Sequence, residues 1–458
     1  MSHWHSDNIR VAIDVSFREL DSSVSATTDG LFGITKYPAK FIPQVVNYAL
    51  NQATMKSDTE HSVTDPFAGV GTVAISAHLR HIDSELWDIN PMMSHYQSAH
   101  RVALNSLNMS PLDAAQGVER RLRQITESEH EMSEENVTYL SQWYHPDIFR
   151  VMLSLWSTYM DSTEVERSIL LSPLIRVSNK WSYNDLQRQK LSRSKHKHQL
   201  IEAWINNRNW RDTLLNELVS GVNDTTMRYL QHRERAPWRY DPYVRIIKSG
   251  TADPLPYGAG HVVVTSPPYL QAQEYIRSSK LPLLWLGHTQ DEIRAQAKLE
   301  IPYGKPDDKQ KISSPTFDHV FGFFDRKQDT GALSILRSYF TNSLKVLERS
   351  SASANEVYLF VGSANLHGTS IPLDVIFAEH FTQELDWTHV ATLSDRIVGK
   401  TLFKMSINPT TGRPDERMIT EQMVILKRKD RHDKYGDRAD GRNCVARIKP
   451  YQRARKRI

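Results

Sequence analysis

A run of β-branched residues that ends in two consecutive prolines constrains this chain more than any other feature of its sequence. Residues 261–265 read His-Val-Val-Val-Thr, which is typical of a buried parallel strand. Ser266, Pro267, Pro268 and Tyr269 follow directly, and prolines cannot continue a sheet ladder because they lack an N–H donor. The chain must therefore leave the sheet at Ser266, at the carboxyl edge where ligands of open α/β sheets bind.

This turn carries the groups needed to hold a planar base with an exocyclic amine. The two N–H donors of an NH2 group can be accepted by the Ser266 oxygen and the Pro267 carbonyl. Tyr269 offers a ring face on which a base can stack. We therefore take Ser266, Pro267, Pro268 and Tyr269 as the candidate catalytic residues. The alternative is a strand exit that prolines stiffen without any catalytic role.

A second motif, residues 65–72, predicts a strand, a glycine turn and a helix. Gly69 and Gly71 allow a backbone to approach a ligand closely. Asp88 ends the next short strand, 17 residues after Gly71, near the spacing at which a carboxylate meets ribose hydroxyls. The two features together predict a nucleotide-like cofactor. The candidate cofactor-binding residues of this part are Asp65, Pro66, Phe67, Ala68, Gly69, Gly71, Thr72, Asp88 and Ile89.

Together, these motifs resemble those of the S-adenosylmethionine-dependent amino-methyltransferases of DNA. The serine form of the tetrapeptide is typical of the cytosine-N4 members, whereas adenine-N6 members more often begin it with Asp or Asn. The resemblance covers residues 30–92 and 245–428. It implies S-adenosylmethionine as cofactor and double-stranded DNA as substrate, with a cognate restriction endonuclease as a further candidate partner. It also implies an α/β class I methyltransferase fold, with a doubly wound, seven-stranded, mostly parallel sheet.

Three further stretches are similar to the family pattern. Tyr37, Pro38, Lys40 and Phe41 match a segment that closes over the methionine end of the cofactor. Residues 275–287 resemble the helix that follows the catalytic strand, and residues 250–256 resemble the turn before it. In that turn, family members often place an acid directly after the first glycine, where it contacts the adenine amine. Here Thr251 takes that position, and Asp253 is the nearest acid and our candidate for the contact.

The single cysteine, Cys444, bears on the chemistry. Methylation of carbon 5 of cytosine needs a thiolate that adds to the ring, and Cys444 lies in a basic tail far from either motif. Methylation of an exocyclic nitrogen is therefore favoured. One cysteine also excludes an internal disulfide, and no His-Glu-x-x-His spacing occurs, so we expect no metal. The N-terminus lacks signal-peptide features and no 18-residue apolar run exists, so we expect a cytoplasmic protein.

Charge is concentrated in two segments. Residues 176–240 contain 13 Lys and Arg against 6 acids, a net charge of +7, and residues 427–458 contain 13 against 4, a net charge of +9. Since the whole chain carries only +4, the remainder is acidic, and two basic segments on an acidic body suit DNA binding. The candidate DNA-binding residues are Arg188, Arg193, Lys195 and Lys197.

These observations divide the chain into five parts. One of them, an insertion at residues 93–243, shows helical periodicity. We assign it to target recognition, with a dimerisation surface or a cofactor lid as alternatives. The basic tail, residues 429–458, either contacts DNA or is a terminal segment that keeps the protein soluble. The parts are an N-terminal segment (1–30), a cofactor-binding first part of the methyltransferase domain (31–92), a helical insertion (93–243), a catalytic second part (244–428) and a basic tail (429–458).

The sequence therefore predicts a site-specific methyltransferase that acts on the N4 amine of cytosine in double-stranded DNA. No active site can reach that amine inside a stacked pair, so the base must be flipped out. Adenine-N6 methylation of DNA is the close alternative. RNA and protein-glutamine methyltransferases carry similar motifs that begin with Asn or Asp. A DNA-binding module that retains the fold without catalysis is the alternative from another functional class.

Overall fold

The computed structural model describes most of the chain. Tyr37, Pro38, Arg188, Asp253 and Cys444, which the sequence analysis singled out, lie outside it. The described residues are 9, 11–24, 26–35, 40–54, 61–105, 110–125, 132–185, 191–236, 241–248, 260–270, 275–301, 304–362, 364–396 and 420–429.

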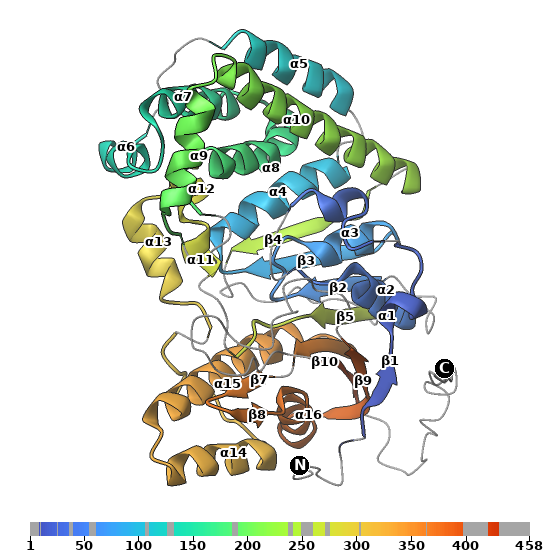
Figure 1. Ribbon diagram of the computed structural model, residues 1–458. Coiled ribbons are helices and arrows are strands. Elements are labelled where there is room, and N and C mark those ends of the chain that lie inside the picture. Colours follow the sequence, from blue (N-terminus) through green and yellow to red (C-terminus); the bar gives the residue numbers. More distant parts are fainter. Residues whose placement is uncertain are drawn as a thin grey trace, which may run out of the picture.

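One mixed sheet organises the molecule (Figure 1). Its strands are adjacent in the order β4, β3, β2, β5, β6, β10, β9 and β1. β10 runs antiparallel to both of its neighbours, and the other pairings are parallel. In that order the strands are Val244–Lys248, Asp83–Asp88, His61–Asp65, Gly260–Thr265, Glu356–Gly362, Thr420–Arg428, Trp387–Arg396 and Ile13–Val15.

The predicted α/β class and the mostly parallel sheet are confirmed, and the strand number is corrected from seven to eight. The additional strand, β1, comes from the N-terminal segment and pairs with β9 in parallel. Near the other edge of the sheet, β9 and β10 pair antiparallel to each other. A separate two-stranded hairpin follows β6, with strands β7 (Ala364–Leu366) and β8 (Thr369–Ile371).

Strand β5 is buried on both faces, as its unbroken apolar sequence predicts. Val262 and Val264 pack into a core with α2, whereas Val263 between them packs into the core formed with α14, α15 and α16. Successive side chains of a strand point to opposite faces, so one valine run fills both cores. The helices are α1 (Phe17–Leu20), α2 (Pro43–Thr54), α3 (Thr72–His78), α14 (Pro315–Arg326), α15 (Thr330–Ser350) and α16 (Leu373–Glu384).

The segment between β3 and β4 is helical, as predicted. Its first helix, α4 (Pro91–Asn105), packs on β3 and β4, and α8 (Glu164–Lys180) packs on α4. The remaining helices lie beyond the β4 end of the sheet in Figure 1. They are α5 (Pro111–Arg123), α6 (Glu134–Ser141), α7 (Pro146–Met160), α9 (Lys195–Ile205) and α10 (Trp210–Arg235). None of the described helices is long and apolar enough to cross a membrane.

Stacked tryptophans join the helical insertion to the segment after β5. That segment contains α11 (Tyr275–Ser278), α12 (Lys280–Trp285) and α13 (Gln290–Ala297). Trp285 stacks on Trp156 of α7, with ring centroids 5.8 Å apart and planes 3° from parallel. Its indole N–H donates to the Tyr144 hydroxyl at 3.0 Å. Both tryptophans are fully buried, so this contact holds together parts that lie far apart in the sequence.

We predict that Trp285→Ala lowers the free energy of unfolding by about 3–5 kcal/mol, the range for large aromatic truncations in a core. Urea denaturation measures this loss. Trp285→Phe is the matched control, because it keeps an aromatic ring against Trp156 and removes the donor to Tyr144; its loss should be smaller. An alanine variant as stable as the phenylalanine variant would mean that the stack does not hold the two parts together.

Candidate functional site

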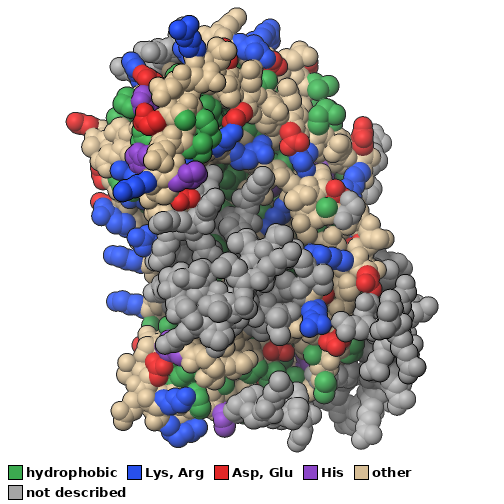
Figure 2. Space-filling view, in the orientation of Figure 1, with side chains coloured by type: hydrophobic (Ala, Val, Ile, Leu, Met, Phe, Trp, Pro, Cys, Tyr) green, Lys and Arg blue, Asp and Glu red, His purple; other side chains and the backbone are tan. Residues whose placement is uncertain are grey.

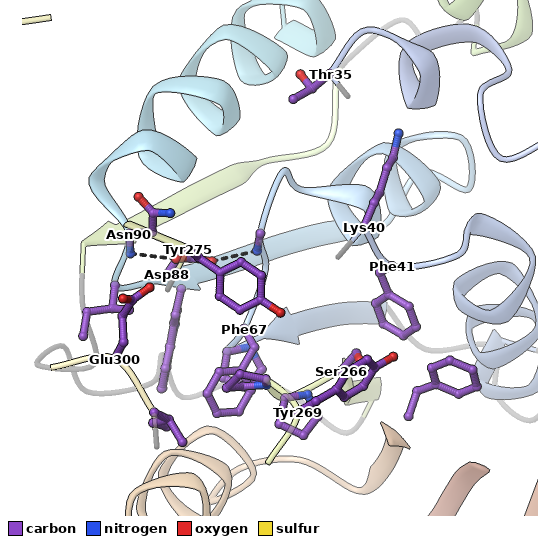
Figure 3. Close-up of a pocket in the computed structure, with 18 of the residues that line it drawn as sticks. Thr35, Lys40, Phe41, Phe67, Asp88, Asn90, Ser266, Tyr269, Tyr275 and Glu300 are labelled. Atoms are coloured by element: carbon purple, nitrogen blue, oxygen red, sulfur yellow. Dashed lines mark hydrogen bonds between the residues drawn. The ribbon is translucent and has the colours of Figure 1, made fainter. Parts of the chain in front are cut away.

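A cavity of about 1510 Å³ opens at the carboxyl ends of β2, β3 and β5. Both predicted motifs line it, although they are about 200 residues apart in the sequence (Figure 3). The predicted residues in its wall are Lys40, Phe41, Pro66, Phe67, Gly69, Asp88, Ile89, Ser266, Pro267, Pro268 and Tyr269. Four other predicted cofactor residues, Asp65, Ala68, Gly71 and Thr72, do not line it.

The glycine turn presents bare backbone to the cavity. Gly69 has a φ of +51°, and a Cβ added there would meet nothing within 4 Å. Gly71, with a φ of +86°, is the N-cap of α3, and a Cβ there would press on Leu86. The two glycines therefore have different reasons to lack a side chain: Gly71 closes the turn, whereas Gly69 leaves space in which a ligand can touch the backbone.

Asp88 is fixed beside that space. One of its carboxylate oxygens accepts the N–H of Gly69 and the other accepts the N–H of Asn90, each at 2.8 Å. Burial raises the pKa of Asp88 to about 6, although these backbone N–H groups favour the ionised form. Each carboxylate oxygen keeps acceptor capacity after one bond, so Asp88 can receive hydroxyl donors from a ligand in the cavity.

Asp65 lies behind the cavity wall and connects the two motifs. It is fully buried, and one carboxylate oxygen accepts the Thr265 hydroxyl at 2.6 Å and the Phe67 N–H at 3.1 Å. Burial raises the pKa of Asp65 to about 7. The first bond joins the carboxyl ends of β2 and β5. Asp65 thus positions the glycine turn relative to the tetrapeptide, from behind the cavity wall.

Strand β5 ends at Thr265, as the two prolines predict, and the tetrapeptide turns into the cavity. The hydroxyl of Tyr269 donates to a carboxylate oxygen of Glu421 at 2.7 Å. Burial, and next the charge of Glu421, raise the pKa of Tyr269 well above its ordinary value. The following residue, Leu270, is fully buried and anchors the far side of the turn.

Glu421 is a site residue that the sequence analysis missed. It lies near the start of β10, is buried, and lines the cavity. Because β10 is antiparallel to its neighbours, its beginning lies at the carboxyl edge of the parallel strands. In the sequence, Glu421 stands at the beginning of an apolar strand. That position leads to the site only when the direction of the strand in the sheet is known.

The three described DNA-binding candidates lie away from this cavity and differ in exposure. Arg193 and Lys195, both exposed, line a smaller cavity of about 440 Å³ beside α9. Lys197 is buried, and its ammonium group donates to the Lys180 carbonyl at 2.5 Å. The ammonium group of Lys197 is therefore bound inside the protein, whereas the side chains of Arg193 and Lys195 reach solvent.

Comparison of the sequence with models of protein families and with curated proteins finds no significant match. Among the residues that the structure describes, no group of three or more His, Cys, Asp or Glu side chains is arranged to hold a metal ion.

The raised pKa of Asp65 predicts a pH dependence of stability. Its pKa rises from 3.8 to about 7 on folding, so across that window the folded protein holds a proton that the unfolded chain releases. The free energy of unfolding contributed by this group should therefore fall as the pH rises from about 4 to 7.

The test is urea denaturation of Asp65→Asn at several pH values, since the amide oxygen of the substituted side chain still accepts from Thr265 and does not titrate. The fall in the free energy of unfolding between pH 4 and 7 should be smaller than in the unaltered protein. Asp88→Asn is the control, because the pKa of Asp88 rises only to about 6 and its effect should end near that pH. Parallel pH profiles for Asp65→Asn and the unaltered protein would contradict the raised pKa.

The bond between Tyr269 and Glu421 predicts a measurable coupling. In a double-mutant cycle of Tyr269→Phe and Glu421→Leu, the two losses of unfolding free energy should be non-additive by about 1.5–3 kcal/mol, the scale of a hydrogen bond to a charged group. Glu421→Gln provides the control, because its amide oxygen still accepts from Tyr269. Additive losses would show that the bond does not hold the ring.

Proposed function

We propose that this protein is a DNA methyltransferase that transfers a methyl group from S-adenosylmethionine to the exocyclic N4 amine of cytosine. The observation that carries the proposal is that the tetrapeptide at residue 266 and the glycine turn at residue 69 line a single cavity. Because the substrate would be cellular DNA, the cytoplasm is the compartment we expect.

The residues present fit that cofactor. Gly69 leaves open space over its backbone, Asp88 keeps acceptor capacity for ribose hydroxyls, and Ile89 lines the wall next to it. Pockets for one small ligand typically have volumes of roughly 300–1,000 Å³. The cavity of about 1510 Å³ therefore has room for a cofactor and an extruded base together.

The bound cofactor would supply an electrophilic methyl group on a sulfonium sulfur. Ser266 and the Pro267 carbonyl would accept the two N–H groups of the target amine and direct its lone pair at that methyl group. The Tyr269 ring, held by Glu421, would stack on the base. As the nitrogen–carbon bond forms and the carbon–sulfur bond breaks, the amine loses one proton to water, so positioning is the main contribution of the protein.

Cations at the cavity rim support DNA as the substrate. Lys298 and Lys305 line the cavity, reach solvent, and have no ion-pair partner within the described part of the chain. Lys and Arg side chains also project from the left edge of the face in Figure 2, around the position of α12 and α13 in Figure 1. Phosphates on either side of a flipped base would meet such cations.

The deciding experiment is mass spectrometry of nucleosides from duplex DNA incubated with the purified protein and S-adenosylmethionine. We expect N4-methyldeoxycytidine. Ser266→Ala should slow its formation by at least about 100-fold, the effect of a misplaced reacting group, with little change in cofactor affinity. The control is Ser370→Ala, an exposed serine of the β7–β8 hairpin, which should leave the rate unchanged.

Other products would revise the proposal in different ways. N6-methyldeoxyadenosine as the sole product would overturn the cytosine assignment and keep the amino-methyltransferase assignment. Methylation of RNA and not of DNA would overturn the substrate class. If the protein binds the cofactor and modifies no nucleic acid, the proposed activity is wrong.

A further inference from the structure

An exposed leucine lies at the mouth of the cavity. Leu299, just after α13, is 55% exposed and lines the cavity together with Lys298 and Glu300. A single exposed leucine is ordinary on a protein surface. Of the six large apolar side chains that are exposed in the described part of the chain, however, Leu299 alone lines this cavity. It is therefore open to solvent and also borders the space in which a base would be held.

The turn that carries Leu299 is fixed by hydrogen bonds. The Leu299 N–H donates to the Gln296 carbonyl at 2.9 Å, before the turn. After it, the Gly304 N–H donates to the Glu300 carbonyl at 2.8 Å. The Glu300 side chain is buried, and its carboxylate accepts the Ile276 N–H at 2.9 Å. Because the turn is already ordered, contact with a ligand would cost Leu299 little conformational entropy.

The same turn is bound to the segment that follows the catalytic tetrapeptide. Glu300 accepts the backbone N–H directly after Tyr275, and Tyr275 lines the cavity as Tyr269 does. Figure 3 shows Glu300 and Tyr275 on the same side of the cavity. The turn at Leu299 and the segment after the tetrapeptide therefore form one wall.

Cations accompany the leucine. Lys298 precedes it and Lys305 follows it in the chain, and both lysines are exposed and line the cavity. The Asn342 amide donates to the Lys305 carbonyl at 3.0 Å, which fixes the backbone at the second lysine. An apolar side chain accompanied by cations suits a duplex, because the cations would meet phosphates and the apolar side chain would meet stacked bases.

Base flipping creates the need for such a side chain. The extruded base gives up its pairing and stacking, and the bases next to it lose a stacking partner. Apolar side chains such as leucine insert between base steps in other DNA-binding proteins and replace part of that contact. Insertion would also remove the exposed surface of Leu299 from water, which is favourable.

We propose, on the basis of the function proposed above, that Leu299 is the wedge that enters the duplex as the target base leaves it. Lys298 and Lys305 hold the phosphate backbone while the leucine enters the stack. Leu299 touches neither the methyl group nor the target amine, so it is a positioning residue. The alternative is that Leu299 covers the bound cofactor, and the experiment separates the two roles.

The experiment compares two oligonucleotide duplexes built around a cytosine that the unaltered protein methylates in plasmid DNA. In the first duplex this cytosine is paired with guanine. In the second it faces an abasic site, so no base pair has to open. Leu299→Ala should slow single-turnover methylation of the paired cytosine at least about 10-fold more than that of the unpaired one, because an unpaired base is easier to extrude. Calorimetry should show an unchanged affinity for S-adenosylmethionine.

Two variants serve as controls. Leu299→Met keeps a long apolar side chain and should methylate both duplexes at the rate of the unaltered protein. Leu112→Ala removes another exposed leucine, on α5 and away from the cavity wall, and should change neither rate.

The remaining outcomes overturn the proposal. If Leu299→Ala slows both duplexes equally, or slows neither, the leucine does not assist extrusion of the base. If the same variant binds S-adenosylmethionine more weakly, Leu299 covers the cofactor. If the unaltered protein methylates no DNA, the proposed function and the wedge are both wrong.

Discussion

The hydrogen bond from Thr265 to Asp65 joins the carboxyl ends of β5 and β2, and the cavity depends on the adjacency of these two strands. From this pair the sheet grows in opposite directions, through β3 and β4 on one side and through β6, β10 and β9 on the other. The loops that leave β2 and β5 therefore diverge, which opens a crevice at the carboxyl edge. Parallel pairing thus brings together two turns that the sequence separates by about 200 residues.

The remaining walls of the cavity come from elements that reach this edge for other reasons. Glu421 reaches it because β10 is antiparallel, so the beginning of that strand lies where its neighbours end. Arg176 and Arg228 reach it because α8 packs on α4, which in turn covers β3 and β4. The rigid part of the site is therefore the sheet edge. The helical insertion contributes through packing on α4 and on Trp285 of α12, and through the hydrogen bonds of Arg228 to the Thr28 and Gly30 carbonyls.

Local sequence chemistry predicted those parts of the site that backbone restrictions dictate. The strand exit at Ser266 follows from two prolines, and the close approach at Gly69 follows from a missing side chain. Contacts that depend on the direction of a side chain were not predictable. Lys197 belongs to a basic run, yet it points inward to the Lys180 carbonyl. Strand β1 was not predicted because an alternation over so few residues does not identify a strand, and the pairing comes from β9.

The two ends of the cavity differ in charge, and this difference determines what each end can hold. At the end that contains Asp88, burial raises the pKa to about 6, so the carboxyl group is ready to accept hydroxyl donors and repels anions once it is ionised. At the other end, a pKa of about 8 keeps Lys40 mostly protonated at neutral pH, near Arg228, which pairs with Asp224. A ligand that spans the cavity therefore meets the hydroxyl acceptor Asp88 and the cation Lys40, and the open backbone of Gly69 lies in the same wall.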